Sequence, residues 1–145
     1  MSMLPELNLT AARNNFSSLY DQAYREYNPI LIKRRRDEEV LMLRRDLVQD
    51  TLRAYPLQAQ EVQEPDSSVT LVMPVLELVV NGPTRDKAVD ELVTELKAYA
   101  RDFFAQSALF FHAPNRRHHF PYLLRVLLCN SDEEIRSLIE VENAA

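Results

Sequence analysis

The 145-residue chain contains one glycine, one cysteine and no tryptophan. A single glycine excludes the glycine-rich phosphate loops GxGxxG and GxxxxGK, and with them the nucleotide-binding enzymes of those two kinds. The lone Cys129 excludes a disulfide framework and a thiolate metal site, which is typical of a reducing compartment. The longest apolar run, residues 69–80, is interrupted by Pro74 and Glu77 and is too short to cross a membrane. Without a charged region followed by an apolar stretch at its start, the chain is expected to be soluble and cytoplasmic.

Charge is unevenly distributed along the chain. The net charge is −5, which argues against a nucleic-acid binder over the whole length. Residues 1–54 carry 9 basic and 8 acidic side chains, whereas residues 55–145 carry 8 basic and 14 acidic ones. A weakly cationic first part joined to an acidic second part predicts a protein with two different functions.

The first part predicts the element order strand, helix, strand, strand, helix. Apolar residues that follow Thr10 recur at helical spacing, so we expect Thr10 to cap a helix. The dipeptide Asn28-Pro29 should end it, because the residue before a proline disfavours helical angles. Residues 30–33 and 40–43 predict two antiparallel strands, and residues 46–54 predict a short helix.

The boundary between the two parts is predicted from composition. Residues 55–68 hold two prolines, three glutamines, three acids and two serines, a composition typical of a linker or loop. We therefore expect one domain over residues 1–54 and a second, small α+β domain over residues 69–145.

The second part begins with a β-rich run. Residues 69–80 predict one strand that is bent or bulged at Pro74. Thr84 should cap a helix over residues 85–104, with apolar residues on one face and charges on the other. Further along we expect a strand over residues 105–111, a basic loop over 114–120, an apolar helix or strand over 122–129 and, after a Ser131 capping box, a helix to about residue 140.

Four consecutive cations, Lys33 to Arg36, lie where the two predicted strands reverse direction. A hairpin tip of this kind cannot be core, and clustered like charges favour contact with a polyanion such as the DNA backbone. The alternative is a solvated tip whose charges block edge-to-edge pairing of strands, with residues 37–39 (Asp-Glu-Glu) neutralising the cations.

The sequence Leu7-Asn8-Leu9-Thr10-Ala11-Ala12-Arg13-Asn14-Asn15-Phe16, followed by Ile30-Leu31-Ile32-Lys33-Arg34-Arg35, resembles the Phd/YefM antitoxin family over residues 5–53. The family pattern is a short strand, a helix opening with A-R-x-N-[LF], and a hairpin reading V-x-I-[TK]-R-R-G. The resemblance implies an antitoxin of a type II toxin–antitoxin system, which neutralises a toxin and represses its own operon as a DNA-binding homodimer. Arg36 stands where the family usually has glycine, which puts the geometry of the turn in question.

The resemblance and the charge pattern together name the expected sites. A first-turn Arg13 would face a phosphate bound at the helix start, and the hairpin cations would face the same DNA. The expected DNA contacts are Thr10, Arg13, Asn14, Lys33, Arg34, Arg35 and Arg36. The expected core and dimer residues are Leu7, Leu9, Phe16, Leu19, Ile30, Ile32, Leu41 and Leu43.

The second half departs from the family, whose members typically end in a short flexible tail. Residues 69–104 are weakly similar to HicB-type antitoxin domains through Pro74, Leu76, Gly82, Thr84, Ala88 and Leu92. Ribonuclease-like toxins of the RelE/ParE type are basic, so an acidic helix face would attract one. The expected toxin contacts are Asp86, Asp90, Glu91 and Glu95, although such carboxylates more often form a solvated helix face than a binding site.

The histidines and hydroxyls predict no catalytic or metal site. The adjacent His118 and His119 would point in different directions on a strand, and we expect neither a metal nor another cofactor. The basic segment 116–120 could touch nucleic acid, but a solvated loop is the default. No nucleophile lies in a constrained motif, so a hydrolase has little support. The main alternative is a non-enzymatic interaction module that keeps the fold without DNA recognition.

Overall fold

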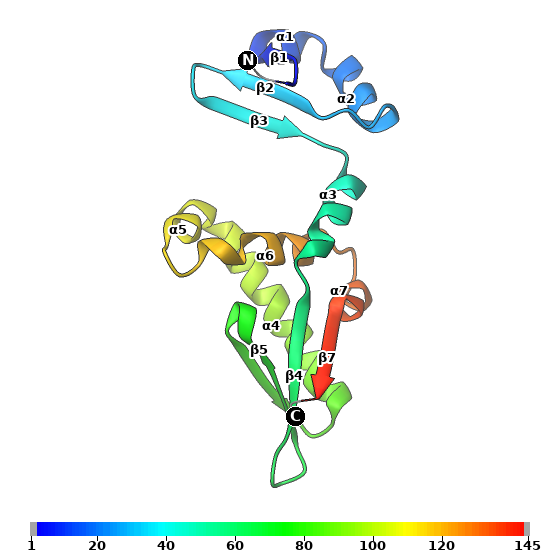
Figure 1. Cartoon of the computed structure of the whole chain (residues 1–145), viewed down its shortest axis with the longest axis vertical. Helices are drawn as coiled ribbons and strands as arrows, with labels where there is room; N and C mark the ends of the chain where they lie inside the picture. Colours follow the sequence, from blue (N-terminus) through cyan, green and yellow to red (C-terminus); the bar gives the residue numbers. More distant parts are fainter. Residues whose placement is uncertain (1–2, 144–145) are drawn as a thin grey trace. The chain divides into compact units, whose positions relative to one another are not determined.

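The computed structural model describes residues 3–143, which divide into two compact units, one ending at Thr51 and one beginning at Leu52 (Figure 1). Each unit has its own sheet and its own buried cluster of apolar side chains. The expectation of a mixed α+β fold is confirmed.

The first unit is a three-stranded sheet with two short helices packed on it. Its sheet order is β1-β2-β3, with β1 parallel to β2 and β2 antiparallel to β3. The hairpin predicted from the two apolar runs is therefore present. The elements are β1 (Glu6–Asn8), α1 (Leu9–Asn14), α2 (Phe16–Arg25), β2 (Ile30–Arg34), β3 (Glu38–Met42) and α3 (Arg45–Thr51).

The prediction of a single helix after Thr10 is wrong, because the chain forms two helices that are separated by Asn15. Asn15 has φ −122° and ψ 25°, and its side-chain Nδ2 donates a hydrogen bond to the Ala11 carbonyl at 2.9 Å. Such a local bond competes with the helical ladder. The helix also begins two residues earlier than predicted. Its N-cap is Asn8, whose side chain accepts from the Ala11 N–H at 2.8 Å, and Thr10 lies inside α1.

The expected core of this unit is only partly confirmed. Leu19 and Ile30 are buried, and the partly buried Leu7 and Ile32 pack against them. Leu43 is half-buried. The remaining three expected core residues are exposed in the single chain: Leu9, Phe16 and Leu41. Phe16 is exposed because the short α2 buries only the narrow face that carries Leu19 and Ala23, and Leu41 is exposed because it lies on the edge strand β3, where the adjacent Val40 is exposed too.

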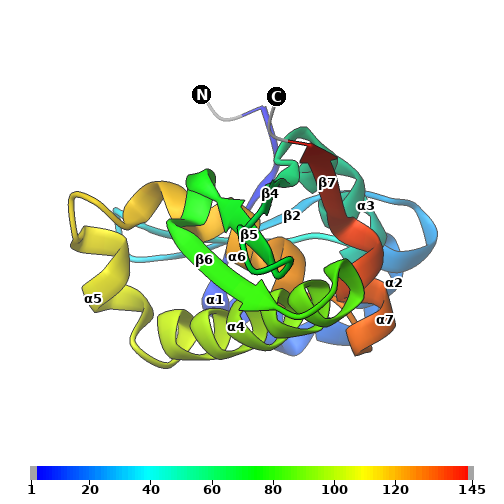
Figure 2. The same ribbon diagram turned by 90° about the horizontal axis from the view of Figure 1, so that it is seen from below.

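The second unit is a four-stranded sheet of order β6-β5-β4-β7 with helices against it, and Figure 2 shows α4 running along the sheet. The long helix α4 contacts β5, β6, α6 and α7 and supplies much of the core. The elements are β4 (Leu57–Gln63), β5 (Val69–Met73), β6 (Leu78–Gly82), α4 (Arg85–Ala105), α5 (Ser107–His112), α6 (Phe120–Leu127), α7 (Asp132–Leu138) and β7 (Ile139–Asn143). Short 3₁₀ turns cover Leu52–Ala54, Pro74–Leu76 and Arg117–His119.

The linker expected over residues 55–68 is wrong. Residues 57–63 form β4, an inner strand of the sheet, and Leu57 and Ala59 are 0% exposed. Gln58 and Gln60, two of the three glutamines that suggested a linker, alternate with these residues and are exposed. A strand with one polar face has the average composition of a loop, and only its two-residue period distinguishes it.

Two further strand predictions are corrected. Residues 69–80 form two antiparallel strands, because the 3₁₀ turn Pro74–Leu76 and a left-handed Glu77 (φ 57°) reverse the chain. Residues 105–111, expected as a strand, lie largely in the helix α5. The apolar stretch after residue 120, left open between helix and strand, is the helix α6.

The helix starts of this unit follow their sequence signals. Thr84 Oγ1 accepts from the Lys87 N–H at 3.2 Å, and Ser131 Oγ accepts from the Glu134 N–H at 3.2 Å. Gly82 stands where β6 meets the first turn of α4, and a Cβ there would lie 2.5 Å from the backbone nitrogen of Ala88. Only glycine allows this close approach.

Candidate nucleic-acid interface

The cationic run occupies the end of β2 and the turn that follows it. Lys33 and Arg34 are the last residues of β2, Arg34 pairs with Glu38 across the hairpin, and Arg35 and Arg36 lie in the turn. Arg34, Arg35 and Arg36 are exposed, and Lys33 is half-buried. The turn therefore presents three guanidinium groups to solvent.

Arg36 stands where the Phd/YefM pattern has glycine, but the turn residue with a left-handed backbone is the one before it. Arg35, not Arg36, adopts the left-handed conformation, with φ 58°. For a residue with a Cβ this conformation costs about 1–2 kcal/mol, since Cβ crowds the following carbonyl. The absence of glycine is therefore accommodated as local strain at Arg35.

Carboxylates of the same sheet partly neutralise the cations. Lys33 Nζ lies 3.7 Å from Glu6 and 3.6 Å from Glu39, and Arg34 Nε donates to Glu38 at 2.6 Å. Arg35 lies 4.0 Å from the same Glu38. Within residues 3–143, Arg36 has no carboxylate within ion-pair distance. Exposed pairs of this kind contribute only about 0–1 kcal/mol each, so a phosphate can displace them.

The predicted contacts of the first helix are placed differently from expectation. Because α1 ends at Asn14, Arg13 lies in its last turn, where a cation is favoured by the helix dipole. The prediction that Arg13 lies in the first turn of its helix is therefore wrong, whereas its contact with phosphate stays a prediction. Asn8 is in register with Lys33, so the start of α1, with Thr10, lies near the hairpin end of the sheet. Across the described chain no hydrogen bond or ion pair joins Arg13 or Asn14 to the hairpin.

An exposed aromatic stripe follows the outer side of α2. Phe16, Tyr20 and Tyr24 stand four residues apart and are 51–55% exposed, and the rings of Tyr20 and Tyr24 stack at 6.4 Å. The Arg44 guanidinium lies 4.3 Å from the centroid of Tyr24 and 4.4 Å from that of Tyr27. Sequence patterns did not single out Arg44. Its partners are 17 and 20 residues away, so only tertiary contacts reveal the cluster.

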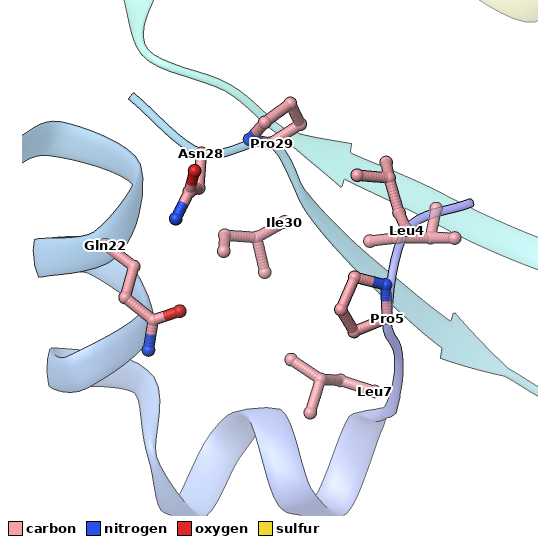
Figure 3. Close-up of a pocket in the computed structure, with 8 residues that line it drawn as sticks. Leu4, Pro5, Leu7, Gln22, Asn28, Pro29 and Ile30 are labelled. Atoms are coloured by element: carbon pink, nitrogen blue, oxygen red, sulfur yellow. The ribbon is translucent and has the colours of Figure 1, made fainter. Parts of the chain in front are cut away.

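A pocket adjoins the core of the first unit, and Figure 3 shows the side chains that line it. A hollow of about 250 Å³ lies between α2 and the strands β1 and β2. Leu7 and Ile30 point into it from the sheet, and Gln22 and Asn28 border it from the side of α2. The first unit therefore leaves apolar surface uncovered.

The acidic residues predicted on α4 fall into two groups. Arg136 of α7 donates to Asp90 at 2.6 Å and to Asp86 at 2.9 Å, so these two carboxylates tie α7 to α4. Glu91 and Glu95 are exposed and have no ion pair within residues 3–143. Arg136 was not predicted, because it stands 46 residues from its nearer partner in sequence.

The histidines form no cluster that a metal would use. Between residues 3 and 143 no three His, Cys, Asp or Glu side chains gather in an arrangement that could hold a metal ion. His119 is instead buried against Tyr99, and His118 is exposed beside it. In the same described range, no helix has the length and apolar character needed to cross a membrane.

The chain is similar in sequence and in structure to known proteins. A family profile described as the PHD-like antitoxins of toxin–antitoxin systems (RelE/RelB) matches residues 3–141. The chain belongs to this antitoxin family. A crystal structure from Syntrophomonas wolfei subsp. wolfei, described as an antitoxin part of a proposed toxin–antitoxin system, is similar over 97% of this chain and 100% of its own. The TM-score is 0.88 and the identity 32%. No curated protein matches the chain.

In the antitoxin, the predicted site residues thus lie in three places. The hairpin groups Lys33 and residues 34–36 at one exposed turn. Thr10 lies near that end of the sheet, while Arg13 and Asn14 lie at the far end of α1. The acidic residues lie in the other unit, on α4.

Proposed function

We propose that this antitoxin is a Phd/YefM-type homodimer that represses its own operon, with the β2–β3 hairpin contacting the phosphates of operator DNA. The observation that carries the proposal is the turn itself, where Arg34, Arg35 and Arg36 are exposed and Arg36 has no carboxylate partner within residues 3–143. A protein acting on its own operator would work in the cytoplasm, and it would need no cofactor.

The carboxylates at the hairpin tune this contact without preventing it. Glu38 competes with phosphate for Arg34 and Arg35, but an exposed pair is worth at most about 1 kcal/mol. Each phosphate that a cation neutralises adds roughly 0.9 to the log–log dependence of affinity on salt. Two hairpins in a dimer would double the number of contacts, and their two-fold symmetry would match a palindromic operator.

A second copy of the chain is the partner that fits the apolar surface of the first unit. Phe16, Tyr20 and Tyr24 are half exposed along α2, and Val40 and Leu41 on the edge strand β3 are 65% and 52% exposed. A unit of about 50 residues is near the lower limit for folding alone, and oligomerisation is a common remedy. Burial of these side chains between copies would complete the small core.

The second unit is proposed to hold a basic toxin of RelE/ParE type through the acidic face of α4. Glu91 and Glu95 are the best candidates, because they are exposed and have no ion pair within residues 3–143. Asp86 and Asp90 could contribute only by leaving Arg136. Opposite surface charge would speed the encounter of the two proteins.

Fluorescence anisotropy with the DNA upstream of the gene, at several salt concentrations, tests the repressor. The double variant Arg34→Ala/Arg35→Ala should bind more weakly and with a shallower salt slope. The matched control is Arg101→Ala, which removes an exposed cation from α4 in the other unit. Equal binding by the double variant and the parent protein would refute the hairpin contact, and sedimentation of the free protein tests the dimer.

Co-expression with the neighbouring reading frame tests the toxin interaction. The antitoxin should rescue growth, and Glu91→Gln/Glu95→Gln should weaken complex formation in a salt-dependent way. Unchanged affinity would exclude this face as the binding surface. If the protein encoded by the neighbouring reading frame does not inhibit growth when it is expressed alone, that protein is not a toxin and the proposed toxin interaction is refuted.

A second candidate function is an interaction module that keeps the fold without binding DNA. The ion pairs of Lys33 with Glu6 and Glu39, and of Arg34 with Glu38, favour it, because they lower the free positive charge of the turn. Anisotropy of promoter DNA that does not rise with added protein, even at low salt, would support this module over the repressor.

A further inference from the structure

One polar side chain is buried without a complete set of hydrogen bonds. His119 is 0% exposed, and its Nδ1 lies 2.6 Å from the hydroxyl of Tyr99 on α4. Within the described chain its Nε2 has no hydrogen-bond partner. Its ring lies edge-on to that of Tyr99 at 5.7 Å, beside the aromatic side chains that α4, α5 and α6 bring together.

A third residue determines which way the hydrogen bond runs. Arg116 Nη1 donates to the Tyr99 hydroxyl oxygen at 2.9 Å, and a guanidinium can only donate. The tyrosine oxygen is therefore an acceptor, and its own hydrogen is available for His119 Nδ1. If Nδ1 donated instead, that hydroxyl hydrogen would need another acceptor, and no other acceptor contacts Tyr99 within residues 3–143. The geometry thus favours a neutral imidazole that accepts at Nδ1 and carries its proton on Nε2.

The surroundings oppose a second proton on this ring. Burial lowers the pKa of His119 below its ordinary value, and the nearby His118 and Arg116 lower it further. The charged group that acts in the other direction is Glu77, which follows the 3₁₀ turn before β6. Protonated His119 would lose its acceptor atom and place a second cation beside Arg116.

We propose that His119, Tyr99 and Arg116 form an acid-sensitive clasp that holds residues 107–119 against α4 and opens locally when His119 takes up a proton. Opening would expose the ring cluster beneath the clasp, in which Phe103 stacks on Phe110 at 5.4 Å. Below a pH of about 6.5, the ordinary value for an exposed histidine, the open form binds protons that the closed form does not. The open population then rises, by at most about tenfold for each pH unit.

Hydrogen exchange of the full chain at pH 7.5, 6.5 and 5.5 tests the clasp. After correction for intrinsic exchange rates, the amides of α5 and of the turn Arg117–His119 should open several-fold more often at pH 5.5 than at pH 6.5. The amides of β4 and β5 should not follow this change. No pH dependence in the clasp, or an equal change throughout the unit, would overturn the proposal.

Two variants separate His119 from its neighbour. His119→Asn keeps an acceptor near the Nδ1 position and does not titrate, so the pH dependence of exchange should disappear. His118→Asn is the matched control and should retain it. Persistence of the full pH dependence in His119→Asn would assign the effect to another group.

A measurement on the unmodified protein does not depend on how the variants fold. Nitrogen chemical shifts of the His119 ring at pH 7.5 should show a bare Nδ1 and a protonated Nε2. The ring should remain neutral at pH 6.5. A proton on Nδ1, or a ring half protonated at pH 6.5, would refute the clasp.

Discussion

Replacement of Glu38 by glutamine should strengthen DNA binding if the hairpin contacts phosphate. In the free antitoxin one Glu38 oxygen lies 2.6 Å from Arg34 Nε and the other lies 4.0 Å from Arg35. Glutamine keeps the shape of the side chain and removes the charge. Both guanidinium groups then meet DNA without first leaving a carboxylate, and one acid near the phosphates is gone.

The size of the effect follows from the exposure of these groups. The side chains of Arg34 and Glu38 are 62% and 44% exposed, so their pair is worth roughly 0.5–1 kcal/mol. This corresponds to an increase in affinity of about two- to fivefold per hairpin, since 1.4 kcal/mol is a factor of ten. Arg36→Ala should act in the opposite direction and lower the salt slope by about 0.9 for each phosphate that the arginine no longer neutralises.

Anisotropy titrations with promoter DNA at four salt concentrations measure both quantities. The control is Glu91→Gln, which makes the same change in net charge on α4 of the other unit and should leave DNA affinity nearly unchanged. The Tm of each variant checks that the hairpin remains folded. A folded Glu38→Gln protein that binds DNA no more tightly than the parent, together with an unaltered slope in Arg36→Ala, would refute the proposed contact.

Three further predictions concern stability. Gly82→Ala should lower the free energy of unfolding by about 1–3 kcal/mol, because the new Cβ would meet the Ala88 backbone at 2.5 Å; urea titration that shows no loss would contradict this close approach. Arg35→Gly should raise the free energy of unfolding by about 0.5–1 kcal/mol through relief of the left-handed backbone, while DNA affinity falls; a lower Tm would argue against strain at this position. Arg136→Gln should cost about 0.5–1 kcal/mol through loss of its two ion pairs with α4, an effect that should shrink at high salt.

Local signals in the sequence predicted many of the elements correctly. The caps Thr84 and Ser131 start their helices as expected, because a cap depends on a side chain and the backbone two or three residues away. The hairpin was also predictable, since two apolar runs flank a charged turn. These features depend on interactions within a few residues of the chain.

Most of the errors arise where partners are distant in sequence. The linker prediction failed because β4 pairs on one side with the last strand, β7, and because average polarity conceals a strand with one polar face. One error is local: Arg13 does not lie in the first turn of α1, because Asn8 rather than Thr10 caps the helix and its start is two residues earlier than predicted. Arg136 and the Tyr99–His119 pair were missed for the same reason as β4, since their contacts join segments 17 to 50 residues apart.

By itself, the sequence determined the α+β class, the hairpin with its four cations and the likeness to antitoxins, because each depends on residue type and short spacing. Only the tertiary structure decided which charged side chains form ion pairs. It pairs Lys33 and Arg34 with carboxylates, leaves Arg36 without one within the described chain, and engages Asp86 and Asp90 with α7. The net charge of a segment can be counted from its sequence. The electrostatic field that a partner meets depends instead on which opposite charges the folded chain brings within about 4 Å of each other.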